Sequence, residues 1–159
     1  MAKVGVGGHR NLPAELAAQI SILLRAELDT FAPEQLVGVT CLADGADTLF
    51  ATEVLAQGGA LEVIVSAAEY RDALPESHHA DYDRLINQAA TVHRLDYQES
   101  TSESHMAASR LMVDGADELY AVWDGKPARS YGGTADVVAY AREHGTPVRV
   151  IWPDGAERG

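Results

Sequence analysis

The sequence predicts a single three-layer α/β domain with a mainly parallel sheet of about six strands. The chain has 159 residues, of which 47% are hydrophobic, and this is enough for one domain with one core. Short apolar runs alternate along the chain with amphipathic helical patterns, and loops rich in glycine follow several of the predicted strands. Together these features are typical of a Rossmann-like fold.

The first predicted unit is a strand followed by a long helix. Residues 3–7 form the strand, and the helix has Asn11 as its N-cap and Pro13 in its first turn. Pro33 marks the end of this unit. Apolar residues recur in the helix at the spacing of one face, which we expect to pack on the sheet: Leu16, Ile20, Leu23, Leu24 and Leu28.

The middle of the chain contains two more strands and an irregular segment. Residues 36–40 predict the second strand, and the helix after it runs to about Gln57, before a glycine pair typical of a C-cap. Residues 61–65 predict a short buried strand. The segment 67–90 contains a loop and a side helix. Three residues of this loop are predicted to close over a ligand: Glu69, Tyr70 and Arg71.

The same alternation continues to the end of the domain. The later elements are predicted as strands at 92–95, 119–123 and 148–152 and helices at 102–113 and 134–144. A loop at 124–133 lies before the last helix, for which Thr134 is the predicted N-cap. We assign residues 1–153 to the domain and 154–159 to a disordered tail.

Composition limits the expected partners. Twelve basic and 24 acidic side chains give a formal net charge of −12, which repels a phosphate backbone, so nucleic acid is not expected as a partner. No apolar run reaches the roughly 18 residues of a membrane span, so we expect a cytoplasmic protein without membrane contact. One cysteine, Cys41, cannot form a zinc site, and we place His78 and His79 on a solvated helix face. Neither a metal nor a resident cofactor is expected.

The loop after the first strand is the first candidate for ligand binding, because ligands of parallel sheets bind outside the C-terminal ends of the strands. It contains Gly7, Gly8, His9 and Arg10. The glycines allow the backbone to approach an anion closely, and an arginine binds phosphate through paired hydrogen bonds. His9 either contacts the ligand or bonds to backbone. The alternative for the glycine pair is a tight turn without a ligand.

Two further loops are predicted to lie at the same edge of the sheet. The second loop has small residues that permit close approach to a ligand or, alternatively, only tight packing of a helix capped by Asp44. The third loop ends at a helix N-terminus, which attracts anions, and its Trp123 either stacks on a base or packs beneath the loop. Their candidate residues are Ala43, Asp44, Gly45 and Asp47 in the second loop, and Trp123, Asp124, Gly125, Gly132, Gly133 and Thr134 in the third.

The three loops together resemble those of a known group of proteins. The stretch from Arg110 through Trp123-Asp124-Gly125 to Gly132-Gly133-Thr134 resembles the YpsA-like branch of the SLOG superfamily, Rossmann-like domains related to Lonely guy and DprA proteins. Residues 4–10 look like the glycine and arginine loop of those proteins, and residues 40–47 resemble a DprA stretch with the same small residues and aspartate. The resemblance covers most of the chain. It implies a homodimer and a site for a nucleotide or a derivative such as ADP-ribose.

We therefore expect a sensor or processing protein that binds a nucleotide-like small molecule. In this interpretation Asp47 and Asp136 face the ribose or a reacting bond. The phosphate is held by the loop residues Gly7, Gly8, Arg10, Gly45, Gly132, Gly133 and Thr134.

Two alternatives remain open. One is a Lonely guy-like phosphoribohydrolase that cleaves the bond between base and ribose, with Asp136 and Arg110 as candidate catalytic residues. Asp136 stands where that family has a glutamate, and Ala108 or Ser109, rather than Arg110, falls at the position of its arginine. The other alternative is an interaction module whose glycine loops are only structural.

Overall fold

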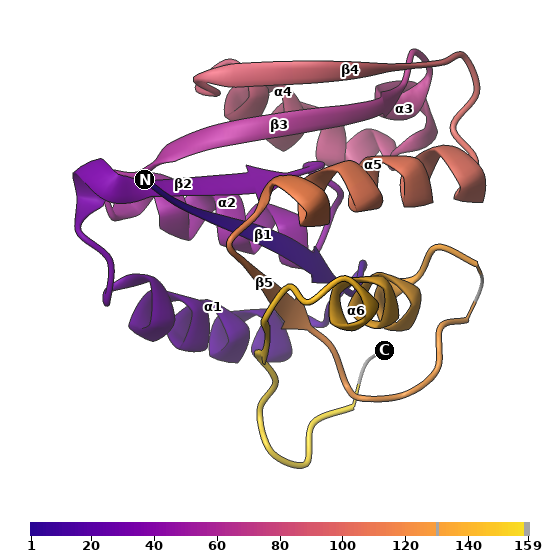
Figure 1. Ribbon diagram of the computed structural model, residues 1–159. Coiled ribbons are helices and arrows are strands. Elements are labelled where there is room, and N and C mark those ends of the chain that lie inside the picture. The colour runs from indigo at the N-terminus through magenta and orange to yellow at the C-terminus, as the bar shows by residue number, and fades with distance from the viewer. Residues whose placement is uncertain (130, 158–159) are drawn as a thin grey trace.

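The computed structural model describes residues 1–129 and 131–157, and it confirms the predicted α/β fold. The strands form one parallel sheet in the order β4-β3-β2-β1-β5-β6 (Figure 1). They are β1 (Ala2–Gly8), β2 (Leu36–Thr40), β3 (Ala60–Ala67), β4 (Thr91–Tyr97), β5 (Glu118–Val122) and β6 (Val148–Val150).

The order of the strands reverses between β1 and β5. Strands β2, β3 and β4 are added in turn on one side of β1, whereas β5 pairs with its other side and β6 follows. Val4, for example, lies opposite Gly38 on one side and Glu118 on the other. Because all strands are parallel, the loops after β1, β2, β3 and β5 leave the sheet at one edge. In open α/β sheets, ligands bind at this edge beside the reversal.

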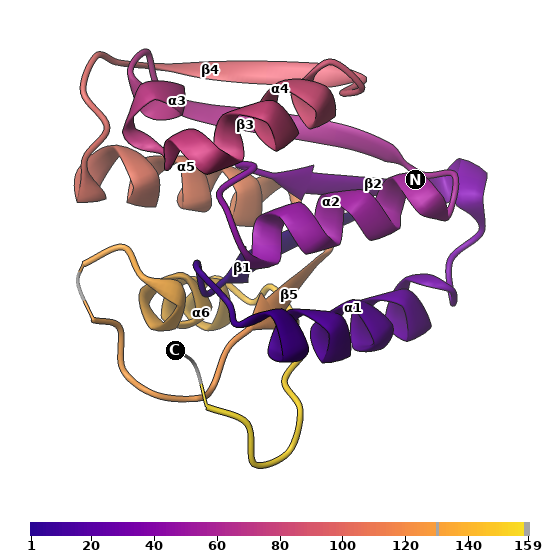
Figure 2. The same cartoon turned by 180° about the vertical axis from the view of Figure 1, so that it is seen from behind.

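Helices cover both faces of the sheet. The helices are α1 (Ala14–Leu28), α2 (Ala46–Ala56), α3 (Tyr70–Ala73), α4 (His79–Ile86), α5 (Ser102–Gly115) and α6 (Thr134–Glu143), with short 3₁₀ turns at Pro33–Gln35 and Glu76–His78. Helices α1, α2 and α4 lie on one face, and α5 and α6 lie on the other (Figures 1 and 2). This arrangement gives the predicted three layers.

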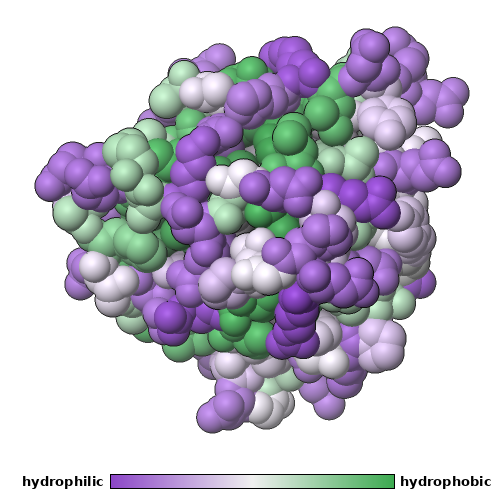
Figure 3. Space-filling view, in the orientation of Figure 1, coloured by the Kyte–Doolittle hydropathy of each residue, from purple (hydrophilic) through white to green (hydrophobic). Residues whose placement is uncertain are grey.

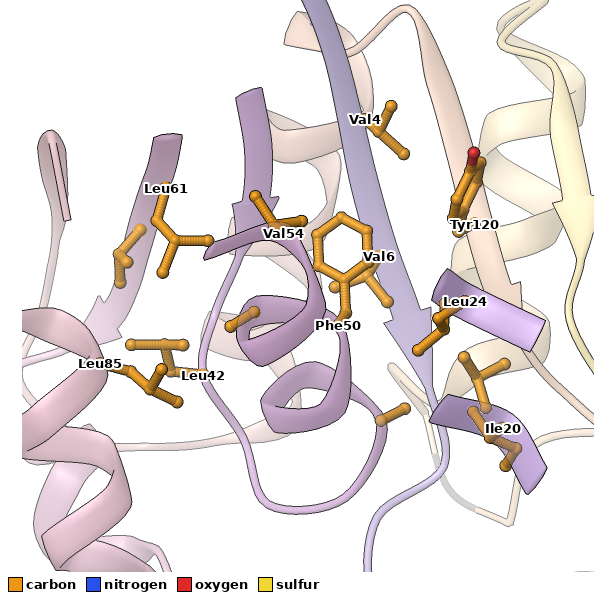
Figure 4. Close-up of a cluster of buried hydrophobic side chains, with 14 of the residues drawn as sticks. Val4, Val6, Ile20, Leu24, Leu42, Phe50, Val54, Leu61, Leu85 and Tyr120 are labelled. Atoms are coloured by element: carbon orange, nitrogen blue, oxygen red, sulfur yellow. The ribbon is translucent and has the colours of Figure 1, made fainter. Parts of the chain in front are cut away.

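The core consists of one apolar layer on each face of the sheet. On the face of α1, α2 and α4, Phe50 and Tyr120 meet edge to face with ring centres 6.2 Å apart, beside the fully buried Leu24 (Figure 4). Burying a side chain such as Leu24 contributes about 1.5–3 kcal/mol. On the other face, Met106 and Met112 of α5 belong to a second layer.

The start of α1 differs from the prediction. The N-cap is Pro13 rather than Asn11, whose φ of +54° places it in the turn before the helix. Pro13 holds an extended backbone, and its carbonyl accepts the hydrogen bond from the N–H of Ala17 (2.8 Å). Pro13 thus starts the helix through its fixed backbone conformation, without a hydrogen bond from a capping side chain.

Two later boundaries also differ. Helix α6 has Gly133 as its N-cap, because the carbonyl of Gly133 accepts from the N–H groups of Asp136 and Val137, and Thr134 is the first helical residue. Strand β6 ends at Val150, earlier than predicted, and the Trp152 indole donates to the Ala156 carbonyl (3.0 Å).

Two further predictions concern the C-terminal tail and membrane contact. In the predicted tail, Asp154 and Gly155 form a turn, and residues 158 and 159 lie outside the described residues, as does Ser130 in the loop at 124–133. Across the described ranges, no helix combines the length and apolar character needed to cross a membrane.

Candidate functional site

The loops after β1 and β2 are packed against each other. The carbonyl of His9 accepts a hydrogen bond from the N–H of Ala46 (3.1 Å), and the N–H of His9 donates to Val122 of β5 (3.1 Å). At Gly8, an added Cβ would lie 2.4 Å from the Cβ of Ala46, closer than real side chains allow. Gly45 has a φ of +85°, and a Cβ added to it would lie 2.6 Å from the carbonyl oxygen of His9. These two glycines are therefore required for the loops to meet.

Arg10 is fixed at this junction by an ion pair. Its Nε donates to Asp44 Oδ1 (2.8 Å), and its Nη2 lies 2.7 Å from the same oxygen. Asp44 thus orients the arginine and does not cap helix α2, whose N-cap is Gly45. The Arg10 side chain is 46% exposed, so it remains open to a ligand. Its position is set by a carboxylate that the sequence alone did not assign to it.

Asp47 is a buried carboxyl group in the first turn of α2. Its Oδ2 accepts a hydrogen bond from the N–H of Ala43 (3.1 Å), and the residue is 8% exposed. Burial raises the pKa of Asp47 to about 7, and Asp44 raises it too, although the Ala43 N–H and the Arg10 guanidinium oppose this rise. At neutral pH this group can therefore both donate and accept a proton.

The loop before α6 presents the N-terminus of that helix to the same edge. The N–H of Gly132 donates to Asp136 Oδ2 (2.9 Å), which ties the loop to the first turn of the helix. Gly132 has a φ of +87°, and its ideal Cβ would lie 3.0 Å from the Ser102 carbonyl. The N-terminus of a helix carries a partial positive charge and free N–H groups that favour an anion.

The three loops meet around a cleft of about 640 Å³ at the C-terminal ends of the strands. Helix α5 forms one wall of this cleft. On the face that carries α5 and α6, hydrophobic residues show between hydrophilic ones (Figure 3). Of the predicted site residues, those that line the cleft are Gly7, Gly8, His9, Arg10, Ala43, Asp44, Asp47, Gly132, Gly133 and Thr134.

Other predicted residues are not among the described residues that line the cleft. Gly45 packs beneath the first loop. The Trp123 indole donates to the Lys126 carbonyl (2.8 Å), and the N–H of Asp124 donates to His9 Nε2 (3.1 Å). Gly125, with a φ of +82°, lies in the open part of the loop.

The two candidate catalytic residues are engaged elsewhere. Arg110 donates to the Tyr131 hydroxyl (3.0 Å), and its guanidinium lies 5.7 Å from the centre of the Tyr140 ring. Asp136 accepts from the Gly132 N–H. The structure therefore does not bring these two side chains together in the cleft.

The cleft also contains residues that the sequence did not mark as ligand-binding. Ser66 lies in the buried C-terminal half of β3, and His105 comes from the first turn of α5. The sequence could have indicated Ser66, because it directly follows the predicted buried strand at 61–65. It could not have indicated His105, because the direction in which His105 points depends on how α5 packs across the sheet. Of the three residues predicted to close over a ligand, Tyr70 lines the cleft and is buried, whereas Arg71 pairs with Asp83 (2.7 Å).

His78, in the turn before α4, does not lie on the solvated helix face predicted for it, and His79, the first residue of α4, is half-buried. His78 is only 6% exposed, and its Nε2 lies 2.8 Å from the carbonyl of Leu42. Leu42 itself is fully buried with a φ of +57°. The hydrogen bond of His78 therefore links the turn before α4 to the loop after β2.

No family model matches the sequence, and no curated protein matches it at a significant level. Solved structures do match. DNA processing protein A (DprA) of Streptococcus pneumoniae is 18% identical with a TM-score of 0.71, over 94% of this chain and 50% of that one. DprA of Helicobacter pylori is 16% identical with a TM-score of 0.70, over 99% and 68%. A molybdenum cofactor binding protein of Rippkaea orientalis is 16% identical with a TM-score of 0.58, over 94% and 75%.

These similarities show the fold and correct one prediction. The chain spans half the length of the Streptococcus structure. The fold is the Rossmann-like α/β type that the two DprA structures share. The Helicobacter protein has a described binding mode for single-stranded DNA. The exclusion of nucleic acid as a partner is therefore wrong, because net charge averages over the whole surface and a protein of this same fold binds single-stranded DNA.

Proposed function

We propose that this protein binds a nucleotide or nucleotide derivative in the cleft, through the phosphate of the ligand. The observation that carries the proposal is the convergence of Arg10, the glycine loop after β1 and the N-terminus of α6 on one cleft beside the reversal of strand order. Its volume of about 640 Å³ lies within the range of small-molecule sites. The resemblance to the YpsA-like branch of the SLOG superfamily supports the same ligand class.

The phosphate end of the cleft is formed by Gly7, Gly8, Arg10, Gly132 and Gly133. Asp44 engages Arg10 through Nε and Nη2, so N–H groups on Nη1 can bind phosphate oxygens while the ion pair holds the side chain in place. Backbone N–H groups at the start of α6 add fixed dipoles. This local arrangement attracts an anion although the whole chain is acidic.

The first test is thermal denaturation of the purified protein with AMP, ADP, ADP-ribose, NAD and a single-stranded DNA oligonucleotide. A ligand at a hundred times its Kd raises the free energy of unfolding by about 2.7 kcal/mol. We expect Arg10→Ala to abolish this gain. The matched control is Arg84→Ala, which removes an exposed arginine that pairs with Asp81 away from the cleft (3.4 Å). Stabilisation that survives Arg10→Ala, or none by any compound, contradicts the proposal.

A second candidate function, hydrolysis of the bond between base and ribose, is favoured by one observation at Asp47. Its buried carboxyl lines the cleft, and its pKa of about 7 suits a general acid that protonates the departing base while water adds to the ribose carbon. Asp136, the candidate from the sequence, bonds instead to its own loop.

The hydrolase is tested by release of free adenine from AMP. The expected result is release by the unaltered protein that falls at least about a hundredfold in Asp47→Asn. Asp136→Asn is the matched control, since it makes the same chemical change outside the cleft. Equal loss in both variants, or the absence of release, removes this candidate and leaves binding without hydrolysis.

A further inference from the structure

The end of the cleft farthest from α6 along the sheet has a different character from the phosphate end. We call it the inner end, and it is formed by Cys41, Ser66, Tyr70, His105 and Ala108. Cys41 follows β2 and Ser66 lies in β3, whereas His105 and Ala108 come from α5. Ser66 therefore lies two strands from β1, about 10 Å at the usual spacing of neighbouring strands.

Ser66 carries a buried hydroxyl that faces this end. The residue is 1% exposed, and within residues 1–129 and 131–157 its Oγ has no hydrogen-bond partner. Buried polar atoms in proteins are nearly always hydrogen-bonded, so an unpartnered one that lines a cleft calls for a specific explanation. A hydroxyl can donate one hydrogen bond and accept others, and a polar atom of a ligand can supply the partner.

The side chains that form the inner end carry no formal charge, and the charged groups that act on them electrostatically, Asp47 and Arg10, belong to other parts of the cleft. Burial raises the pKa of the Tyr70 phenol and of the Cys41 thiol, so both keep their protons at neutral pH. The pKa of His105 is lowered by burial and by Arg10, which favours the neutral imidazole. The rings of Tyr70 and His105 meet edge to face, 5.7 Å between centres. Such a lining suits a flat, uncharged ring better than a second phosphate.

We propose that the inner end binds the base of the nucleotide and that Ser66 Oγ forms the hydrogen bond that selects it. This inference rests on the proposed function, because it places the phosphate at Arg10 and the N-terminus of α6. A ribose then bridges the two ends across β2. Asp47, in the first turn of α2 after β2, lies on this path. Ser66 is thus a specificity-determining residue that the sequence did not indicate.

The test is calorimetric binding of AMP, GMP, CMP, UMP and ribose 5-phosphate to the unaltered protein and to Ser66→Ala. Ribose 5-phosphate probes the phosphate end alone. We expect at least one nucleotide to bind more tightly than ribose 5-phosphate and to lose about tenfold in affinity in Ser66→Ala. The affinity for ribose 5-phosphate should stay within about twofold. Ser21→Ala, on α1, is the matched control and should change none of the five affinities.

Each other outcome has a definite meaning. If Ser66→Ala leaves all four nucleotides unchanged, or weakens ribose 5-phosphate equally, the inner end does not select a base, and the proposed function stands alone. If the unaltered protein binds none of the five compounds, both the mononucleotide site and this inference are overturned. The variant should fold normally, because it removes an oxygen atom that has no partner among the described residues. Circular dichroism with thermal denaturation checks this point.

Discussion

The two glycine-rich parts of the site are built differently. The first is the junction of the loops after β1 and β2, where Gly8 and Gly45 are surrounded by other atoms. An added Cβ at Gly8 would lie 2.4 Å from Ala46 Cβ and 2.8 Å from Val122 Cβ. The second is the loop from β5 to α6. At Gly125, in this loop, an added Cβ would meet no described atom within 4 Å.

The loop from β5 to α6 is shaped mainly by hydrogen bonds, and close packing in it is confined to Gly132, whose ideal Cβ lies 3.0 Å from the Ser102 carbonyl. The N–H of Lys126 donates to Asp124 Oδ1 (3.0 Å), and Asp136 holds the N–H of Gly132 (2.9 Å). Glycines that look alike in a sequence thus have two physical causes, the exclusion of a side chain at the junction and backbone conformation in the loop. The junction should be intolerant of added volume, whereas the loop should lose little stability when one of its hydrogen bonds is removed.

The largest expected effect is at the junction, in Gly8→Val. The new side chain must enter space already held by Ala46 and Val122, so the free energy of unfolding should fall by more than about 4 kcal/mol, the extreme end for single substitutions. Urea denaturation followed by circular dichroism measures this loss. The control is Gly7→Ala, since an added Cβ there meets Val137 Cγ1 at an ordinary 3.5 Å. Similar stability of the two variants would show that the junction can open.

The next effect is the pH dependence that Asp47 gives to the junction. Its pKa rises from 3.8 to about 7 on folding, so the folded state holds a proton that the unfolded chain releases between these values. The free energy of unfolding should therefore fall as pH rises from about 4 through 7 and then level off, by up to about 4 kcal/mol from this group.

Asp47→Asn removes this contribution, because an amide does not titrate. The difference in free energy of unfolding between the unaltered protein and Asp47→Asn should change with pH between 4 and 8, in favour of the variant as pH rises. Urea denaturation at each pH gives this difference. Asp136→Asn, next to the loop from β5 to α6, serves as the comparison. A difference that is constant with pH would mean that the Asp47 pKa is not raised.

The smallest expected effect is that of Asp136→Ala, at the end of the loop from β5 to α6. The variant loses the hydrogen bond to the Gly132 N–H, and the loss of such a contact at the start of a helix costs about 1 kcal/mol. Thermal denaturation should show a decrease of a few degrees. A loss as large as that of Gly8→Val would mean that the loop is as tightly constrained as the junction.

The sequence was sufficient for those parts of the fold that depend on local patterns. Strand β2 lies at the predicted residues 36–40, because a buried apolar run is bounded there by turns. The end of α2 was also predictable, since Gly58, directly after the C-cap Gln57, has a φ of +86° that is unfavourable for other residues. By contrast, Leu42 adopts a φ of +57°, and its local sequence carries no signal of this conformation.

The parts of the site that depend on packing between distant segments were not predictable. The pairing of Arg10 with Asp44 spans 34 positions, and either residue could have chosen other partners. The orientation of Ser66 toward α5 follows from the register of β3, which a single strand pattern does not fix. Net charge misled the prediction about nucleic acid because it describes an average field and not a local surface.

The central position of β1 has a consequence for how the domain forms. Strands β2, β3 and β4 join it through successive crossovers, but β5 reaches it from far along the chain, as the bond between Lys3 and Asp117, 114 positions apart, shows. Pairings between distant segments form slowly, because closing a long loop costs entropy before any contact compensates. The cleft is therefore complete only once β5 has docked on β1 and brought α6 beside the β1 loop. A ligand that needs both ends of the cleft can bind only after this docking, so its binding energy stabilises the fully assembled domain.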